Sequence, residues 1–112
     1  MIVLLRQKVS TIEMQQMQET YAGFIKLAVD IRRKMLTGGG EMHSDCESVL
    51  LEDGSLQEDI WGANWYPSEQ RVEFESLINI RPAQGNRSII IQSEELCQKI
   101  EQIVVDLLGG VA

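Results

Sequence analysis

Basic residues, histidine and cysteine are scarce in this sequence, and each shortage excludes some classes of function. Ten Lys and Arg stand against 17 Asp and Glu, which gives a formal net charge of −7. Duplex nucleic acids and anionic membrane surfaces are bound through clustered basic side chains, so we expect neither as a partner. The two cysteines, Cys46 and Cys97, match no metal-ligand spacing and no disulfide framework, which indicates reduced thiols in a cytoplasmic protein.

Long apolar runs are also missing. No window approaches the roughly 18 uncharged apolar residues that a transmembrane helix needs. The apolar residues 1–5 are followed by Arg6 and have neither a basic leader nor a small-residue cleavage site, so we expect no signal peptide. With 44% apolar and 24% charged residues, the chain has an ordinary globular composition, and its length suits one domain over residues 1–112.

Capping signals predict helices near both ends of the chain. Ser10 and Glu13 form a capping box, in which the serine hydroxyl accepts the third helical N–H and the glutamate reaches back to the cap. A helix is therefore predicted from Ser10. Ser93 begins the last helix, which Gly109 and the next glycine end. The buried stripe of this helix consists of Leu96, Ile100, Ile103, Val104 and Leu107.

Three stretches have the composition of β-strands. Residues 2–5 are leucine or β-branched, which predicts a buried strand. Residues 58–66 and 72–81 are separated by the turn residues Pro67 and Ser68, which predicts an antiparallel hairpin. The proline after residue 81 ends the second strand, because proline cannot donate to a sheet ladder.

The segment after Gly23 fits two structures. Apolar residues recur at helical spacing from Phe24 to Met35, which favours a continuation of the first helix. Gly23, however, stands where a helix would end, and the segment is rich in strand-forming side chains. The residues alone leave a helix and a strand open.

Residues 38–47, GGGEMHSDCE, hold the only histidine of the chain within an acidic cluster. Ser44 and Glu47 form a second capping box, which predicts a short helix over residues 45–53 that Gly54 ends. At a period of two, the same acidic residues would instead line one face of a strand. The capping box and the glycine favour the helix.

Three blocks of the sequence resemble a known family. They are residues 39–47, GGEMHSDCE, residues 50–62, in which LLEDGS leads to a Trp-Gly pair, and residues 78–88, in which INIRP is followed by GNRS. Proteins with these blocks form a small bacterial and archaeal family catalogued only as a domain of unknown function. The resemblance implies a shared fold and a shared set of polar residues, without an assigned activity. Cys46 departs from the pattern, because some members have alanine there.

The resemblance also bears on the ambiguous segment. In the family, the counterpart of Phe24–Ile31 is richer in valine, which favours a strand there and a second extended piece at Met35–Thr37. We therefore expect a single α+β domain. Its sheet would be mixed or mostly antiparallel with about four strands, and three helices would pack mainly on one face.

The acidic and histidine cluster is the first candidate site. His43, Asp45 and Glu47 would be catalytic residues that bind a divalent cation through one imidazole and two carboxylates, or that transfer a proton. Their spacing matches no established metal signature. The structural alternative is that the two carboxylates favour the positive end of a helix dipole and that His43 is hydrogen-bonded to a neighbour.

The second candidate site is a basic loop. Arg81, Asn86 and Arg87 would bind a phosphate or carboxylate through their side chains, with bidentate contacts from the guanidinium groups. Asp30 would join them as an acidic neighbour, and Trp61 would stack on a flat ligand. The structural alternatives are ion pairs between the arginines and nearby acids, and a tryptophan in the core.

Three functions follow from these candidates. The preferred one is the binding of a small anionic ligand between the His43 cluster and the arginine loop. The first alternative is a metal-dependent hydrolase, in which the cation activates a water molecule. The second alternative is a structural protein whose apolar hairpin forms a homodimer, so whether the chain is an enzyme stays open.

Overall fold

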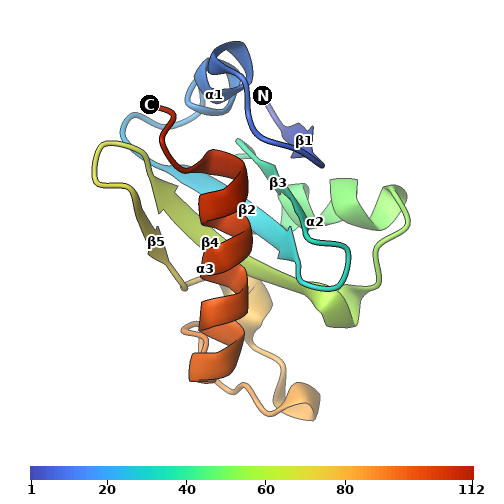
Figure 1. Cartoon of the computed structure of the whole chain (residues 1–112). Coiled ribbons are helices and arrows are strands. Elements are labelled where there is room, and N and C mark those ends of the chain that lie inside the picture. Colours follow the sequence, from blue (N-terminus) through green and yellow to red (C-terminus); the bar gives the residue numbers. More distant parts are fainter.

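The computed structural model describes residues 1–112 and is built around a five-stranded antiparallel sheet (Figure 1). The strands lie side by side in the order β1 (Val3–Leu5), β3 (Met35–Gly38), β2 (Ile25–Asp30), β4 (Ile60–Tyr66) and β5 (Arg71–Glu73). The sheet has one strand more than the roughly four expected from the sequence. The α+β class is as expected, and all four strand pairings are antiparallel.

The ambiguous segment after Gly23 is a strand. β2 pairs with β3 on one side and with β4 on the other, from Ile25 opposite Trp65 to Asp30 opposite Ile60. Five of its six residues are buried, so both faces of the strand are covered. A strand covered on both faces has a continuous apolar sequence, which is why apolar spacing alone did not distinguish it from a helix.

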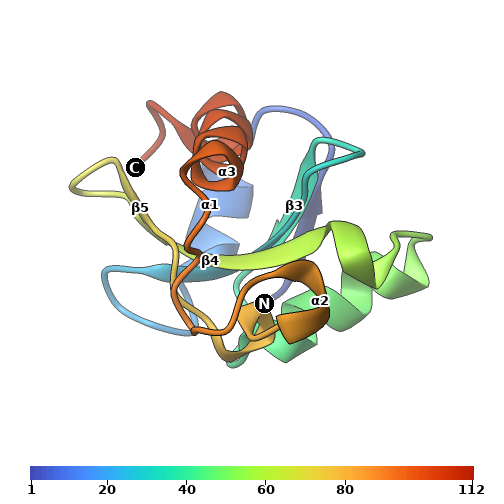
Figure 2. The ribbon, with the colours of Figure 1, turned by 90° about the horizontal axis from the view of Figure 1, so that it is seen from below.

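Helices cover both faces of the sheet (Figure 2). The helices α1 (Thr11–Met17) and α3 (Glu94–Leu108) pack on the face that carries Leu27 and Val29, and α2 (His43–Glu52) packs on the opposite face. Two of the three helices thus share a face, and the third lies alone across the sheet. None of the helices has the length and apolarity needed to cross a membrane.

Two of the predicted helix starts are confirmed. Both bonds of the Ser10–Glu13 capping box are present, at 3.0 and 3.1 Å. At the start of α3, the Ser93 hydroxyl accepts a hydrogen bond from the backbone N–H of Leu96 at 3.2 Å.

The capping box predicted at Ser44 is wrong. The helix α2 begins at His43, and the carboxylate of Asp45 accepts the backbone N–H of Met42 at 3.3 Å. Ser44 lies inside the first turn, where its carbonyl oxygen accepts from the Ser48 hydroxyl.

The hairpin of β4 and β5 is confirmed, but its second strand is shorter than predicted. Tyr66 pairs with Arg71 and Asn64 pairs with Glu73, where β5 ends. Beyond it, the Ser76 hydroxyl accepts the backbone N–H of Ile78 and turns the chain into a short 3-10 helix over Leu77–Asn79. The prediction of a strand to residue 81 is therefore wrong.

Candidate functional site

A polar row crosses three strands on the α2 face of the sheet. Lys26 of β2 lies opposite Asn64 of β4, and Asn64 lies opposite Glu73 of β5. Neighbouring strands are about 4.8 Å apart, so the row is roughly 10 Å long. Because side chains alternate between faces, the row lies on the side of the sheet away from α1 and α3.

The imidazole of His43 lies against the middle of this Lys26–Asn64–Glu73 row. Its Nε2 is 2.8 Å from Oδ1 of Asn64 and 3.1 Å from the carbonyl oxygen of Ala63. The amide nitrogen of Asn64 donates to two acceptors, the Glu73 carboxylate at 3.1 Å and the carbonyl oxygen of Glu75 at 3.2 Å. The amide orientation is thereby fixed, so Nε2 of His43 carries a proton and donates it.

The second ring nitrogen of His43 faces no partner within the chain. Nδ1 makes no hydrogen bond, and it is not among the polar atoms that are sealed from solvent. Burial lowers the pKa of His43 below its ordinary value of 6.5, against the opposing effect of the hydrogen bonds to Asn64 and Ala63. At neutral pH the ring is therefore neutral, and Nδ1 is a free hydrogen-bond acceptor.

The row and His43 line a pocket of about 520 Å³. One wall is aromatic, because the rings of Phe24 and Tyr66 stack with centroids 5.9 Å apart. Another part of the lining is aliphatic and consists of Leu77, Ile78 and Ile89. This volume and this mixture of apolar walls with a few polar groups are typical of small-molecule sites. We call it the His43 pocket.

The two ends of the His43 pocket carry opposite charges. Lys26 is its only basic side chain, and its ammonium group uses one of three donors on the carbonyl oxygen of Glu41 at 3.0 Å. Glu73 and Glu75 provide the acidic end. The carboxylate of Glu73 also accepts from the Tyr66 hydroxyl at 3.2 Å, whereas the exposed carboxylate of Glu75 makes no hydrogen bond within the chain.

The other two residues of the acidic cluster lie outside this pocket. Asp45 is exposed and caps α2 through Met42. Glu47, one helical turn after His43, is buried, and its Oε2 lies 3.7 Å from the guanidinium of Arg81 without a hydrogen bond. No group of three or more His, Cys, Asp or Glu side chains is close enough together to hold a metal ion.

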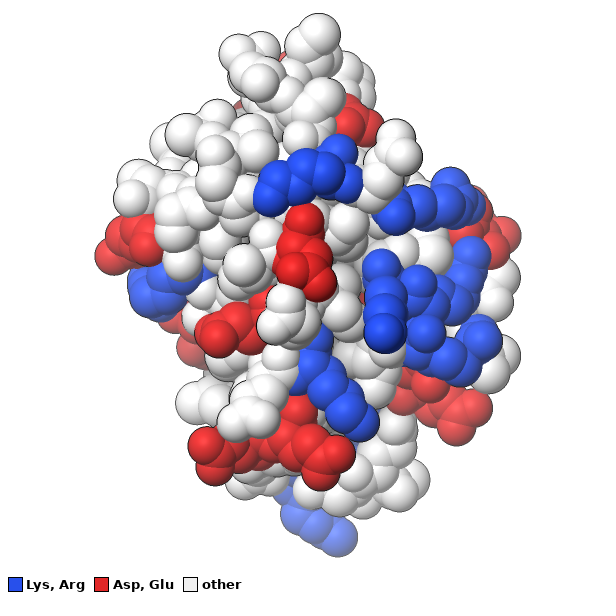
Figure 3. Space-filling model, viewed as in Figure 1, with Lys and Arg blue, Asp and Glu red and all other residues white.

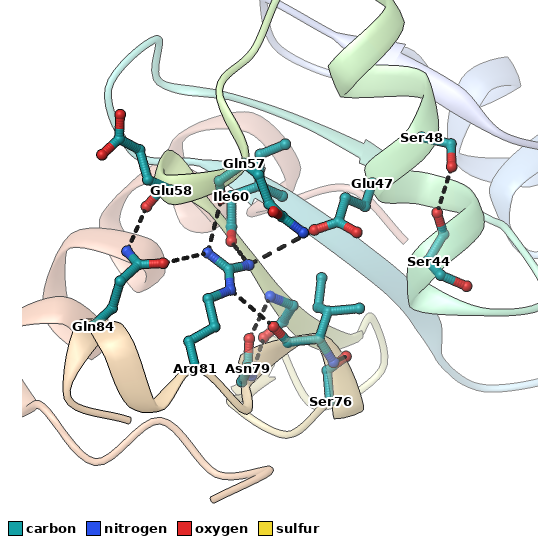
Figure 4. A network of polar contacts seen from close by, with 12 residues as sticks. Ser44, Glu47, Ser48, Gln57, Glu58, Ile60, Ser76, Asn79, Arg81 and Gln84 are labelled. Atoms are coloured by element: carbon teal, nitrogen blue, oxygen red, sulfur yellow. Dashed lines mark hydrogen bonds and ion pairs between the residues drawn. The ribbon is translucent and has the colours of Figure 1, made fainter. Parts of the chain in front are cut away.

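Arg81 is bound to the protein itself (Figure 4). Its guanidinium stacks on the Trp61 ring at 4.5 Å, and burial lowers its pKa while the charge of Glu47 raises it. The acceptors of its hydrogen bonds are the carbonyl oxygens of Ile78, Gln57 and Ile60 and the side chain of Gln84. Four of its five N–H groups are thus used to join β4 to the loops around it.

Asn86 and Arg87 do not complete an anion site with Arg81. Asn86 is 4% exposed, and its amide nitrogen donates to carbonyl oxygens at 2.8, 2.9 and 3.3 Å within its own loop. The side chain of Arg87 is exposed, takes part in no ion pair and lines none of the four pockets. The loop is therefore organised by its own hydrogen bonds.

Asp30 and Trp61 are interior residues. The carboxylate of Asp30 is fully buried, accepts the backbone N–H groups of Arg32 and Arg33 at 2.9 Å, and accepts the Ser55 hydroxyl at 2.6 Å. It thereby shapes the turn between β2 and β3. Trp61 is 4% exposed within the core beneath α3.

His43 and Arg81 line neighbouring pockets rather than a shared one. The smaller pocket, of about 360 Å³, is lined by Arg81 and Glu47. Leu77 and Ile78 line both pockets, so this short segment separates them. The two candidate sites of the sequence thus meet at a common wall.

The residues around His43 were not identified from the sequence. Lys26 and Asn64 each interrupt an apolar strand, and Glu73 ends one. A polar side chain inside an otherwise buried strand is the signal that would have pointed to them. These three residues lie near His43 only because of the register of three strands, and no local sequence pattern reveals this register.

Of the polar residues described above, His43, Glu47, Arg81 and Asn86 fall in the three sequence blocks that suggested a family, whereas Lys26, Asn64 and Glu73 lie outside them. No curated protein and no solved structure matches the chain. A family model does match, over residues 3–107, and its description is Protein of unknown function (DUF5674). The chain belongs to this family.

Proposed function

We propose that this protein binds a small zwitterion in the His43 pocket, with the carboxylate of the ligand at Lys26 and its ammonium group at Glu73 and Glu75. The observation that carries the proposal is the imidazole of His43, which Asn64 orients so that Nδ1 is left without a partner in a pocket. As expected from the sequence, the proposed ligand carries an anionic group, but Lys26 rather than Arg81 binds this group.

The charges of the pocket support a zwitterion over an ion of one sign. A simple anion would pair with Lys26 but would lie close to two carboxylates, and a simple cation would meet the opposite problem. A ligand with both charges satisfies both ends, and the row of roughly 10 Å between them suits a short molecule. The aromatic and aliphatic walls would cover its carbon skeleton.

His43 supplies the specificity in this proposal. A neutral imidazole with Nε2 protonated accepts a hydrogen bond through Nδ1, so it selects a ligand with an N–H or O–H donor. An analogue without this donor would leave Nδ1 unpaired in a partly buried site, which weakens binding.

The two other functions expected from the sequence have less support. A metal-dependent hydrolase needs a set of ligands that this fold does not bring together. For a homodimer of the hairpin, no feature of β4 or β5 indicates a second copy. The two unpaired cysteines agree with a reducing compartment, so the proposal includes a cytoplasmic location.

Isothermal titration calorimetry tests the proposal. The probes are γ-aminobutyrate and free phenylalanine, compared with phenethylamine and phenylpropionate, which each lack one of the two charges. We expect at least one zwitterion to bind about tenfold or more tightly than the single-charge compounds, because each unpaired end of the pocket loses about 1.4 kcal/mol or more.

The variants assign the binding to the pocket. Lys26→Met and His43→Gln should each weaken binding of the zwitterion about tenfold, and the matched charge control Arg87→Gln, at a residue that lines none of the four pockets, should not. Equal binding of all four compounds, or zwitterion binding that survives both pocket variants, would contradict the proposal.

A further inference from the structure

A second pocket lies on the opposite face of the sheet, between α3 and the turn that joins β2 to β3. Its volume is about 540 Å³. The apolar part of its lining comes from Ile103 and Leu107 of α3 and from Ile31 of the turn. Arg32, Lys34 and Lys99 are the basic residues around it. We call it the α3 groove.

The α3 groove is lined by three basic and two acidic residues, in a protein with a net charge of −7. Of its two acidic residues, Asp59 pairs with Arg32 at 2.8 Å, and Asp106 accepts a hydrogen bond from Gln102 at 2.8 Å. Among the basic residues, Lys99 also pairs with Glu95 at 3.5 Å, whereas Lys34 takes part in none of the ion pairs of the chain. Figure 3 shows basic side chains gathered on the side of the molecule where Figure 1 places this turn.

Hydrogen bonds fix the shape of the turn, and this shape determines to which side each of its basic side chains points. The buried carboxylate of Asp30 accepts two successive backbone N–H groups of the turn. Arg33 points to the α2 side, where it pairs with Asp53 at 2.7 Å and donates to Ser55 at 2.8 Å. Its neighbours Arg32 and Lys34 line the α3 groove instead.

Lys34 occupies a backbone conformation that favours glycine. Its φ is +54°, in the left-handed region, where a side chain is disfavoured and glycine is not. A glycine would suit the turn better and would remove the one basic side chain of the groove that has no partner. Gln70, in the turn after β4, has the same conformation with a φ of +51°, so the position of Lys34 in the groove, and not its backbone, supports a binding role.

We propose that the α3 groove binds a small anionic amphiphile, with its aliphatic chain on Ile103 and Leu107 and its anionic head between Lys34, Lys99 and Arg32. The lining contains no aromatic ring on which a base would stack, so the apolar part of the ligand is aliphatic rather than a nucleobase. The head is a carboxylate or a phosphate, since both are bound by the same cations.

Titration calorimetry with octanoate and octyl phosphate tests this inference. Both amphiphiles should bind the wild-type protein, and the tighter of the two identifies the head as a carboxylate or a phosphate. Octanol, acetate and inorganic phosphate should each bind at least tenfold more weakly, because each lacks the head or the tail. Octanol binding as tightly as octanoate, or acetate binding as tightly as octanoate, would overturn the proposal.

Lys34→Gly is the decisive variant, because it removes the cation and relieves the left-handed backbone together. It should weaken both amphiphiles about tenfold without lowering the melting temperature, so that loss of binding is not loss of folding. Arg87→Gln, which removes a charge that does not line the groove, should leave the affinity unchanged. Amphiphile binding that Lys34→Gly leaves intact would contradict the assignment, as would no binding of either amphiphile.

Discussion

The side-chain amide of Asn79 takes the place of a strand residue opposite Gly62. Its Oδ1 accepts the backbone N–H of Gly62 at 2.8 Å, and its Nδ2 donates to the carbonyl oxygen of Gly62 at 3.0 Å. A residue of a neighbouring antiparallel strand would make the same pair of bonds. β5 ends before this point, so Asn79 and then Arg81, which donates to the carbonyl oxygen of Ile60, close the edge of β4.

This relationship predicts that Asn79 is essential for stability. Asn79→Ala leaves the buried N–H and C=O of Gly62 without partners, and each unpaired group costs about 1–3 kcal/mol. We expect a loss of about 2–4 kcal/mol in the free energy of unfolding, measured by urea denaturation. A loss below about 1 kcal/mol would show that other groups satisfy this edge.

Gly62 has no room for a side chain. An added Cβ would lie 2.5 Å from Cβ of Ser76 and 2.6 Å from its hydroxyl. Gly62→Ala should therefore destabilise the protein by about 1–3 kcal/mol in urea denaturation. In a double-mutant cycle, Ser76→Gly should recover part of this loss, because it removes the closest atoms. Additive losses would mean that this contact is not the cause.

His43 makes stability depend on pH in a defined direction. Its pKa is lowered in the folded protein, so the unfolded chain binds the proton more readily. The free energy of unfolding should therefore fall as the pH drops through 6.5 toward the lower folded-state pKa, and this contribution should be complete above 6.5. The chain has no other histidine, so urea denaturation of His43→Gln should lack this step. An unchanged step in the variant would contradict the assignment.

The two thiols should differ in reactivity. Burial raises the pKa of Cys46 to about 11 and also raises that of Cys97, which is only partly buried. Only a thiolate reacts with a disulfide reagent, so the folded protein should label slowly and at Cys97 first. Mass spectrometry after Ellman's reagent, with the urea-unfolded chain as the control, measures this order. Rapid labelling of Cys46 in the folded state would contradict its burial.

The sequence predicted most of the elements because their signals are local. The capping serines at Ser10 and Ser93 and the hairpin turn at Pro67 depend on neighbouring residues only. The end of β5 was missed because the 3-10 helix over Leu77–Asn79 lies inside the predicted strand, and no local pattern reveals that the Asn79 side chain bonds to Gly62 of β4.

Of the residues in the His43 pocket, the sequence identified only one. His43 was identified because it is the single histidine in a polar cluster. Asn64 and Glu73 were not, since only the pairing of three strands brings them to it. Arg81 was taken for a ligand-binding residue, yet its donors serve backbone carbonyl oxygens that no sequence pattern connects to it.

The most direct test of the His43 pocket is the NMR titration of its imidazole, whose signals need no assignment because the chain has one histidine. The account predicts the tautomer with a proton on Nε2, a pKa below 6.5, and a shift of the Nδ1 resonance on addition of γ-aminobutyrate or phenylalanine that Lys26→Met removes. A ring that titrates at the ordinary pKa, and whose resonances do not respond to either zwitterion, would contradict it.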